Sequence, residues 1–190
     1  MGKALSDMSL EELWELFPII LTEHKEIWNA WYEEEEKRLL TVLPSENITI
    51  SHVGSTAINN IWAKPIVDIL VEIPTSLSMR RVKELLIQNG YQWMSEQQNR
   101  ISFNRGYTSD GFAEKVFHLH LRYAGDNDEL YFRDYLKDNP ILAKQYEQLK
   151  RSLWKKFEHD RDGYTSAKTD FIVEQTNKAK KCYGKRYERS

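Results

Sequence analysis

One short stretch constrains the fold and the chemistry of this 190-residue chain more than any other. Residues 52–56 are His-Val-Gly-Ser-Thr, and Lys64-Pro-Ile-Val-Asp68 begins eight residues later. A turn of small residues lets backbone amides surround an anion, and a lysine and a carboxylate that follow closely are typical of a phosphate or nucleotide site. The stretch therefore predicts an anion site between two strands.

Segment 66–73 is predicted to be a strand with two different faces. Its odd-numbered positions from Val67 to Ile73 are all apolar, whereas Asp68 and Glu72 lie at even-numbered positions. Because successive side chains of a strand point to opposite faces, one face is expected to pack on a core while the other carries carboxylates.

Segments 115–123 and 100–106 show the same alternation and predict a cleft. The polar face of the first carries His118 and His120, and that of the second carries Asn104. An antiparallel sheet often exposes one polar face to water, which is the simpler interpretation. Aspartate and histidine are unusual choices for such a face, so we expect these side chains to converge with Asp68 in a functional cleft.

Helical periodicity surrounds the predicted strands. A capping box, Ser9 with Glu12, opens a short helix that Pro18 ends, and residues 48–53 alternate as a further strand. A strand-rich middle between helix-rich ends, without a flexible linker or a repeat, predicts a single α+β domain. The further helices are expected at about 22–43, 76–88, 128–138, 140–157 and 162–182.

The overall composition narrows the class of protein. Lys plus Arg total 27 against 29 Asp plus Glu, so no general field attracts polyanions, and we expect neither a nucleic-acid partner nor a membrane. Cys182 is the one cysteine, the N-terminal residues lack an apolar signal core, and no run of ~18 apolar residues is present. A cytoplasmic location is expected.

Six motifs in order resemble the GrpB family of small bacterial proteins, which belongs by fold to the nucleotidyltransferase superfamily. The resemblance runs from about residue 20 to 182. The motifs are His52-Val-Gly-Ser-Thr-Ala, Lys64-Pro-Ile-Val-Asp-Ile-Leu-Val, Phe117-His-Leu-His-Leu, Phe132-Arg-Asp-Tyr-Leu, Asn139-Pro140, and Tyr164-Thr-Ser-Ala-Lys168 with Phe171-Ile172.

The resemblance implies a nucleotidyltransferase-like mixed β-sheet flanked by helices. It implies a single GrpB-like domain over residues 1–190, with a sheet-bearing core at about 45–125 and a helical C-terminal part at about 128–185. The chain departs from the family at Asn59-Asn60, where a Pro-Gly pair is usual. Asparagine tolerates left-handed backbone better than other non-glycine residues, so we expect the turn to survive.

The carboxylate pair that holds magnesium in the wider superfamily is incomplete in this chain. Aligned on its strand, Asp68 falls at the second position of the Asp-x-Asp pair and Ile66 at the first. Strand positions i and i+2 are ~7 Å apart and can share a metal, whereas Glu72, at i+4, is ~13 Å away. A divalent ion, Mg or Mn, therefore requires Asp68 with His118 and His120, although imidazoles favour Zn, Mn or Fe.

The first hypothesis is a nucleotidyltransferase-like protein that uses a nucleoside triphosphate and a divalent metal on an acceptor that the sequence does not specify. Catalysis and metal binding are assigned to Asp68, His118 and His120. The residues expected to bind the nucleotide or its phosphates are Gly54, Ser55, Thr56, Lys64, Arg133 and Lys168.

Other interpretations remain open at the level of sequence. A non-catalytic module that binds a nucleotide or a phosphate ligand would have kept the turn and lost the paired carboxylate. A hydrolase with a histidine-bound transition metal is a third possibility. His52 is a candidate acid or base or a buried structural residue, and Tyr164 and Trp62 either stack on a base or pack in the core.

Overall fold

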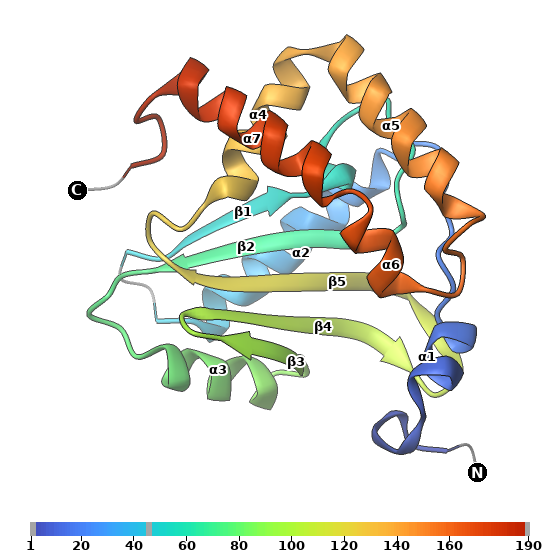
Figure 1. Cartoon of the computed structure of the whole chain (residues 1–190). Coiled ribbons are helices and arrows are strands. Elements are labelled where there is room, and N and C mark those ends of the chain that lie inside the picture. The colour runs from blue at the N-terminus through green and yellow to red at the C-terminus, as the bar shows by residue number, and fades with distance from the viewer. Residues whose placement is uncertain (1–2, 45–46, 189–190) are drawn as a thin grey trace.

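The computed structural model describes residues 3–44 and 47–188 and is built around a five-stranded sheet with the order β1-β2-β5-β4-β3 (Figure 1). β2 and β5 are parallel, and the other neighbouring strands are antiparallel. The strands are β1 (Thr49–Val53), β2 (Val67–Ile73), β3 (Gln92–Gln97), β4 (Arg100–Thr108) and β5 (Gly111–Tyr123). A mixed sheet of this kind confirms the expected α+β class.

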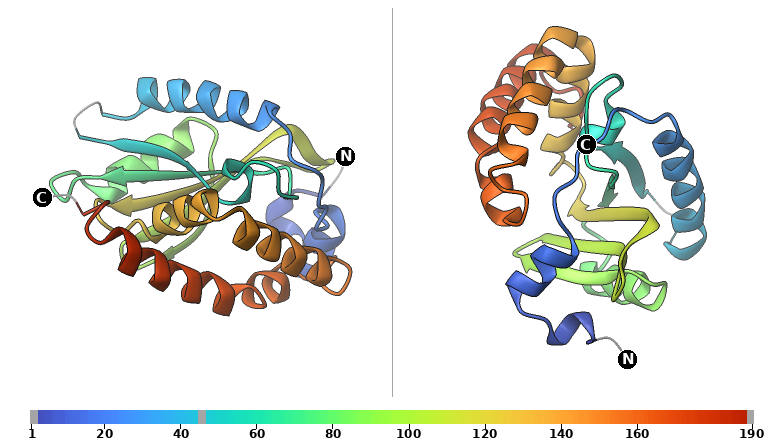
Figure 2. Two further views of the ribbon diagram at one scale, coloured as in Figure 1. Left: turned by 90° about the horizontal axis from the view of Figure 1, so that it is seen from above. Right: turned by 90° about the vertical axis from the view of Figure 1, so that its right-hand side faces the viewer.

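Helices cover both faces of this sheet. Figure 2 shows α2 on one face and α4, α5 and α7 on the other, which gives three layers. The helical C-terminal part follows the last strand, as expected. The helices are α1 (Leu10–Leu16), α2 (Ile27–Val42), α3 (Met79–Gln88), α4 (Asp128–Asp138), α5 (Pro140–Trp154), α6 (Arg161–Ser166) and α7 (Thr169–Tyr183), with 3-10 turns η1 (Leu5–Asp7) and η2 (Ser55–Ala57).

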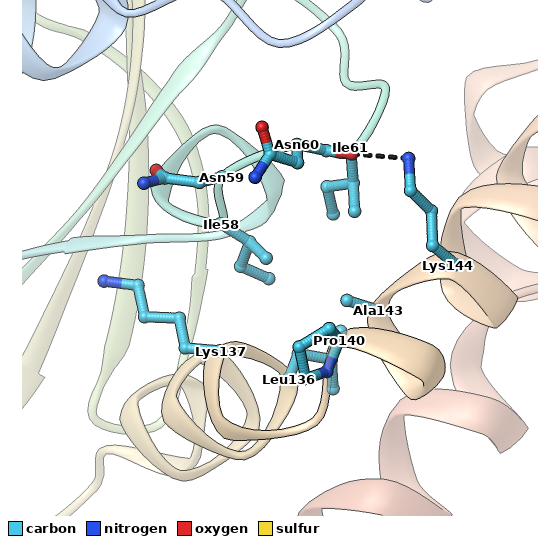
Figure 3. A pocket seen from close by; sticks show the side chains of 9 residues that line it. All are labelled: Ile58, Asn59, Asn60, Ile61, Leu136, Lys137, Pro140, Ala143 and Lys144. Atoms are coloured by element: carbon cyan, nitrogen blue, oxygen red, sulfur yellow. Dashed lines mark hydrogen bonds between the residues drawn. The ribbon is translucent and has the colours of Figure 1, made fainter.

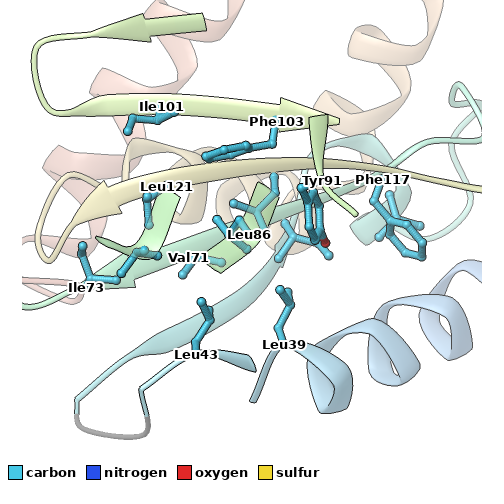
Figure 4. Packing of buried hydrophobic residues seen from close by; sticks show 14 of the residues in the cluster. Leu39, Leu43, Val71, Ile73, Leu86, Tyr91, Ile101, Phe103, Phe117 and Leu121 are labelled. Carbon is cyan, nitrogen blue, oxygen red and sulfur yellow. The ribbon is translucent and has the colours of Figure 1, made fainter. Parts of the chain in front are cut away.

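The main hydrophobic core lies between the sheet and helices α2 and α3 (Figure 4). The odd-numbered residues of β2, Val67 to Ile73, are fully buried there, as the alternation predicted. Leu39 of α2 and Leu86 of α3 pack against them. Each fully buried side chain of this size contributes about 1.5–3 kcal/mol, so this face supplies most of the apolar stabilisation of the sheet.

The opposite face of the sheet is also covered by other residues, so it is not an open groove. Leu70, at an even position of β2, is buried with Val53 and with Leu130 of α4. Glu72 is buried too, and its carboxylate accepts hydrogen bonds from the Gly125 amide and the Asn127 side chain. The polar face therefore encloses a cavity beneath the C-terminal helices.

Several element boundaries differ from the predictions for physical reasons. The helix expected from residue 22 begins at Ile27, because Thr22 pairs with Ala63 in an isolated β-bridge. The predicted 162–182 helix is two helices, α6 and α7. Edge strand β3 was not predicted, since every one of its residues is exposed and its sequence carries no apolar alternation.

Two local predictions are confirmed. Ser9 and Glu12 form the reciprocal capping box at the start of α1. Asn60 has φ 62°, the left-handed conformation that an asparagine was expected to accept in place of the usual glycine. Within residues 3–44 and 47–188, no helix is both long and apolar enough to cross a membrane.

Candidate functional site

A cavity of about 520 Å³ lies between the polar face of the sheet and the C-terminal helices. Strand β2 and parallel strand β5 form its floor, and helices α5, α6 and α7 contribute its walls. It is lined by seven of the residues predicted to form the site: Gly54, Ser55, Lys64, Asp68, His118, His120 and Lys168.

Gly54 is the point at which the turn approaches the carboxylate of β2. Its φ is 70°, and a side-chain Cβ at this position would lie 2.3 Å from Oδ2 of Asp68. The antiparallel register pairs the preceding residue, Val53, with Asp68. Only glycine fits such a close approach in this backbone conformation, so the turn and the carboxylate form one unit.

Asp68, His118 and His120 converge as the alternation of the two strands predicted. The parallel register aligns Asp68 with His118. Oδ1 of Asp68 lies 3.4 Å from Nε2 of His120 and 3.7 Å from Nδ1 of His118. Burial tends to raise the pKa of Asp68, but the hydrogen bond with His120 and the nearby positive charges, including Lys64, lower it to about 2. The carboxylate is ionised at neutral pH.

His118 is held by a chain of polar contacts that extends to helix α6. Arg161 Nη2 donates to the Tyr107 hydroxyl at 2.7 Å, and that hydroxyl lies 2.8 Å from Nε2 of His118. Burial lowers the pKa of His118 to about 3, and the charges of Lys64 and Arg161 act in the same direction. His118 is therefore a neutral imidazole with both ring nitrogens facing polar groups.

Three lysines, Lys64, Lys150 and Lys168, line the cavity on the side of the helices. Within the described part of the chain, no carboxylate forms an ion pair with any of them. Burial and mutual repulsion lower the pKa of Lys64 and of Lys150 to about 7, and burial lowers that of Lys168 to about 8. The cavity thus concentrates cationic groups that lack an anionic partner.

Aromatic rings support these lysines. The Lys168 ammonium lies 4.2 Å and the Lys64 ammonium 5.7 Å from the centre of the Tyr164 ring. Lys150 donates to the carbonyl of Trp62 and lies 4.9 Å from the Tyr146 ring centre. Tyr164 is fully buried, and its hydroxyl finds no hydrogen-bond partner among the described residues.

Two of the predicted phosphate-binding residues lie away from the cavity lining. The Thr56 hydroxyl is 3.0 Å from Nε2 of His52, whose ring stacks on Tyr32 of α2 behind the sheet. Arg133 donates to the backbone carbonyl of His52 at 2.8 Å and to Asp134 at 2.6 Å. The contacts of Arg133 and Thr56 therefore hold β1 and the turn in position.

The aromatic candidates also separate. Tyr164 lines the cavity and is also fully buried, so it packs in the core and borders the candidate site at the same time. Trp62 instead packs near Trp154 and beneath Arg151, with the Arg151 guanidinium 4.6 Å from its ring centre.

Sequence reasoning missed Lys150, Arg161 and Tyr107. Lys150 is only 2% exposed and shares the buried face of α5 with Ala143 and Tyr146. Spacings of three and four residues place them on one helix face, so a lysine on an otherwise buried stripe could have marked it. Arg161 and Tyr107 meet only through tertiary packing, and no local pattern indicates their contact.

The expected metal centre is not formed by protein side chains alone. In residues 3–44 and 47–188, no group of three or more His, Cys, Asp or Glu side chains is arranged to hold a metal ion. One reason is that His118 already contacts Tyr107, and both imidazoles face the same oxygen of Asp68. Asp68 by itself suits a magnesium ion held largely by the phosphates of a ligand.

A separate pocket of about 390 Å³ lies behind the Asn59-Asn60 turn, against the start of α5 (Figure 3). Lys144 donates to the carbonyl of Asn60, which ties the turn to that helix. The pocket is lined by Ile58, Ile61 and Leu136, among others, and none of the cavity residues described above lines it. We assign this pocket no part in the site.

Comparisons with known proteins agree with the resemblance seen in the sequence. The family model described as GrpB protein matches residues 18–178. The glutamate-rich protein GrpB of Alkalihalophilus pseudofirmus is 36% identical over 165 residues, which are 84% of this chain and 94% of that protein. The UPF0157 protein YqkA of Bacillus subtilis is 34% identical, and the match covers 83% of this chain and 46% of YqkA.

A solved structure gives the same result. The crystal structure of the conserved protein GrpB from Enterococcus faecalis superposes with a TM-score of 0.73 at 30% sequence identity. The superposition covers 86% of this chain and 99% of that one. The chain belongs to the GrpB protein family.

Proposed function

We propose that this protein binds a phosphate-bearing ligand, a nucleotide, in the cavity beneath helices α5, α6 and α7. The observation that carries the proposal is the set of three lysines that line the cavity together with the Gly54-Ser55 turn and pair with no carboxylate of residues 3–44 and 47–188. Two of them, Lys150 and Lys168, are buried. Burying an unpaired cation costs several kcal/mol, and a bound polyanion would offset that cost.

The remaining acidic residues of the cavity do not neutralise these lysines. Asp128 pairs with Lys180 at 2.5 Å, and Glu129 lies 3.7 Å from Arg122. Asp162 is exposed at the rim. Asp68 also lines the cavity, but its Oδ1 faces the imidazoles of His118 and His120. The interior therefore keeps a positive excess suited to phosphate.

The turn supplies the second half of the phosphate site. Gly54 and Ser55 line the cavity, and the 3-10 turn Ser55–Ala57 begins there. Backbone amides of a tight turn together with a hydroxyl form a concave donor surface for phosphate oxygens. Charged lysines on one side and neutral donors on the other match a chain of two or three phosphates.

Titration calorimetry with tripolyphosphate and with ATP, in the absence of metal, tests this proposal. We expect both to bind, and we expect Lys64→Met to weaken binding at least about tenfold, because a charge-assisted hydrogen bond contributes about 1.5–3 kcal/mol. Lys155→Met is the matched control, since Lys155 is exposed and lies outside the cavity. Equal affinities for wild type and Lys64→Met would contradict the proposal.

A second candidate is nucleotidyl transfer, which the position of Asp68 between Gly54 and two imidazoles favours. An acceptor hydroxyl would attack the α-phosphorus, the bond to the bridging α–β oxygen would break, and pyrophosphate would leave. His120 would accept the hydroxyl proton, with Asp68 stabilising the imidazolium. A magnesium ion held by Asp68 and the phosphates would supply charge neutralisation.

Metal dependence separates the two candidates. Thermal stabilisation by ATP that is unchanged by magnesium and by Asp68→Asn indicates binding without transfer. Transfer requires instead that labelled nucleotide, with Mg or Mn, gives a labelled product that Asp68→Asn no longer forms. If no nucleoside triphosphate tested gives a labelled product on a protein or small-molecule acceptor, that result counts against transfer. It does not affect the proposal of binding.

A further inference from the structure

An apolar groove of about 770 Å³ lies beside the phosphate cavity, between helix α1 and the β3–β4 edge of the sheet. Leu10 and Met94 are 58% and 53% exposed there, so large apolar side chains face solvent together. Contiguous exposed apolar surface of this kind on a monomer marks a binding site more often than a solvated face.

The groove shares part of its lining with the cavity. Met94, Arg161 and Asp162 line both, and Tyr107, which contacts His118 in the cavity, lines the groove. A ligand with its phosphates among the lysines would therefore extend directly into the groove. Charged side chains lie at the junction of the two spaces, whereas the outer part of the groove is apolar, so the occupant is an uncharged group attached to a phosphate.

Asn104 gives this group a polar contact. It is 4% exposed and lines the groove, and its side-chain oxygen has no hydrogen-bond partner in the described residues. The β4–β5 register places it directly beside His118, on the face of the sheet that forms the cavity floor. A buried amide oxygen without a partner costs about 1–3 kcal/mol, which a donor on the ligand would recover.

We propose that the groove is the base-binding subsite of the nucleotide, with Asn104 recognising an amino-bearing purine of the adenine type. An asparagine amide pairs with adenine through two hydrogen bonds, from its oxygen to the exocyclic amine and from its nitrogen to the neighbouring ring acceptor. This inference rests on the proposed function, because the phosphates must occupy the cavity for the base to reach the groove.

Met94 completes the subsite. The Met94 sulfur lies against the Asn104 amide nitrogen, and a flexible thioether can repack on the edge of an aromatic ring. Trp93 is not part of it, because its partner in β4 is Phe103 of the main core and its ring centre lies 4.7 Å from the ammonium of Lys83 in α3.

The test compares ATP, ITP and tripolyphosphate by titration calorimetry on wild type and on Asn104→Leu. ITP replaces the exocyclic amine with a carbonyl, which the Asn104 oxygen cannot accept from. We expect wild type to bind ATP at least tenfold more tightly than ITP, and Asn104→Leu to bind the two equally. Tripolyphosphate should bind both proteins with the same affinity, because it does not reach the groove.

Two further variants separate recognition from loss of structure. Asn99→Leu, in the exposed β3–β4 turn, is the matched control and should keep the preference for ATP. Trp93→Ala, on the opposite face of the same sheet, is a second control and should also keep the preference for ATP. Tripolyphosphate binding with equal ATP and ITP affinities in wild type would overturn the base subsite alone. Absence of all binding would overturn the phosphate site and this inference together.

Discussion

The two faces of the central sheet are built from the same strands and serve opposite purposes. On the face toward α2 and α3, alternate residues of β2 and β5 are buried among aliphatic and aromatic side chains. On the face toward α4–α7, the intervening residues of the same strands include Asp68, His118 and His120 beside a cavity of about 520 Å³. Neighbouring residues along one strand therefore belong to different regions: one lies in the core and the next in the candidate site.

The two faces contribute to stability with opposite sign. Burial of apolar side chains stabilises the first face, whereas the second buries lysines without a carboxylate partner and a tyrosine hydroxyl without a hydrogen bond among the described residues. Features that cost stability are concentrated at sites of function. We therefore expect stability to depend on the first face and ligand binding on the second, and substitutions can test that division.

The largest expected effect is on the apolar face. Leu119, in the middle of β5, is fully buried in the main core, and Leu119→Ala should lower the free energy of unfolding by about 3 kcal/mol. His120→Ala, the next residue on the cavity face, should change it by less than about 1 kcal/mol. Urea denaturation followed by circular dichroism measures both. Equal losses would end the division between the faces.

Much of the fold follows from patterns that can be found in the sequence. The apolar alternation of 66–73 and 115–123 identified β2 and β5 with the correct face inward, because burial forces a period of two on a strand. β3 carried no such pattern, because an exposed edge strand buries no face. The start of α2 was placed too early, since a tertiary β-bridge between Thr22 and Ala63 replaces the first turn.

The candidate site divides in the same way. Asp68, His118 and His120 were predictable together because paired strands fix which side chains are neighbours. Arg161 was not, since the angle at which a helix packs on a sheet is set by the whole interface. For Lys150 the one signal was its place on an otherwise buried helix face, which does not say what that face covers. The motif around Arg133 did not show where its side chain lies: the guanidinium donates to the carbonyl of His52 and does not line the cavity.

The second prediction concerns the cost of the buried lysines. Lys168→Met keeps a similar volume and removes a buried charge, so at pH 6 we expect the free energy of unfolding to rise by about 1–3 kcal/mol. Binding of tripolyphosphate should weaken at least tenfold in the same variant. Thermal melting and calorimetry report the two effects. A variant that is less stable than wild type would show that the cavity cations are not destabilising.

This gain should shrink as the pH rises. The pKa of Lys168 is about 8 in the folded protein, against about 10.5 in an unfolded chain. Below pH 8 the folded state carries the full cost of the buried charge, and between about pH 8 and 10.5 the folded protein loses that proton first, so wild-type stability rises with pH. Lys155→Met, at an exposed lysine outside the cavity, is the control for this comparison.

The third prediction is the pH dependence of binding. Lys64 and Lys150 have a pKa of about 7 in the free protein, and a bound polyanion raises it, so binding above pH 7 requires proton uptake. Affinity for tripolyphosphate should therefore fall about tenfold between pH 7 and 9. The charge of tripolyphosphate itself does not fall over that range, so an affinity that rises with pH would contradict lysine recognition.

The smallest effect is expected at the turn that leads from the Gly54-Ser55 turn into β2. Asn60 has φ 62°, and Asn60→Ala removes the polar side chain that eases this left-handed conformation, at a cost of about 1 kcal/mol. Asn60→Gly should be at least as stable as wild type, because glycine accepts this backbone freely. The carbonyl that Lys144 contacts is present in both variants, so the difference between them reports the backbone alone.

Asn59 provides the matched control for this comparison. It is an exposed asparagine in the same turn, and it is not among the described residues with positive φ. Asn59→Ala should therefore melt at the wild-type temperature, while Asn60→Ala melts a few degrees lower. Tripolyphosphate affinity should be the same in both, because neither side chain lines the cavity. If Asn60→Ala lost binding as well as stability, the Asn59-Asn60 turn would also position the Gly54-Ser55 turn. The cavity face of the sheet would then depend on the backbone conformation at Asn60 as closely as the apolar face depends on its side-chain packing.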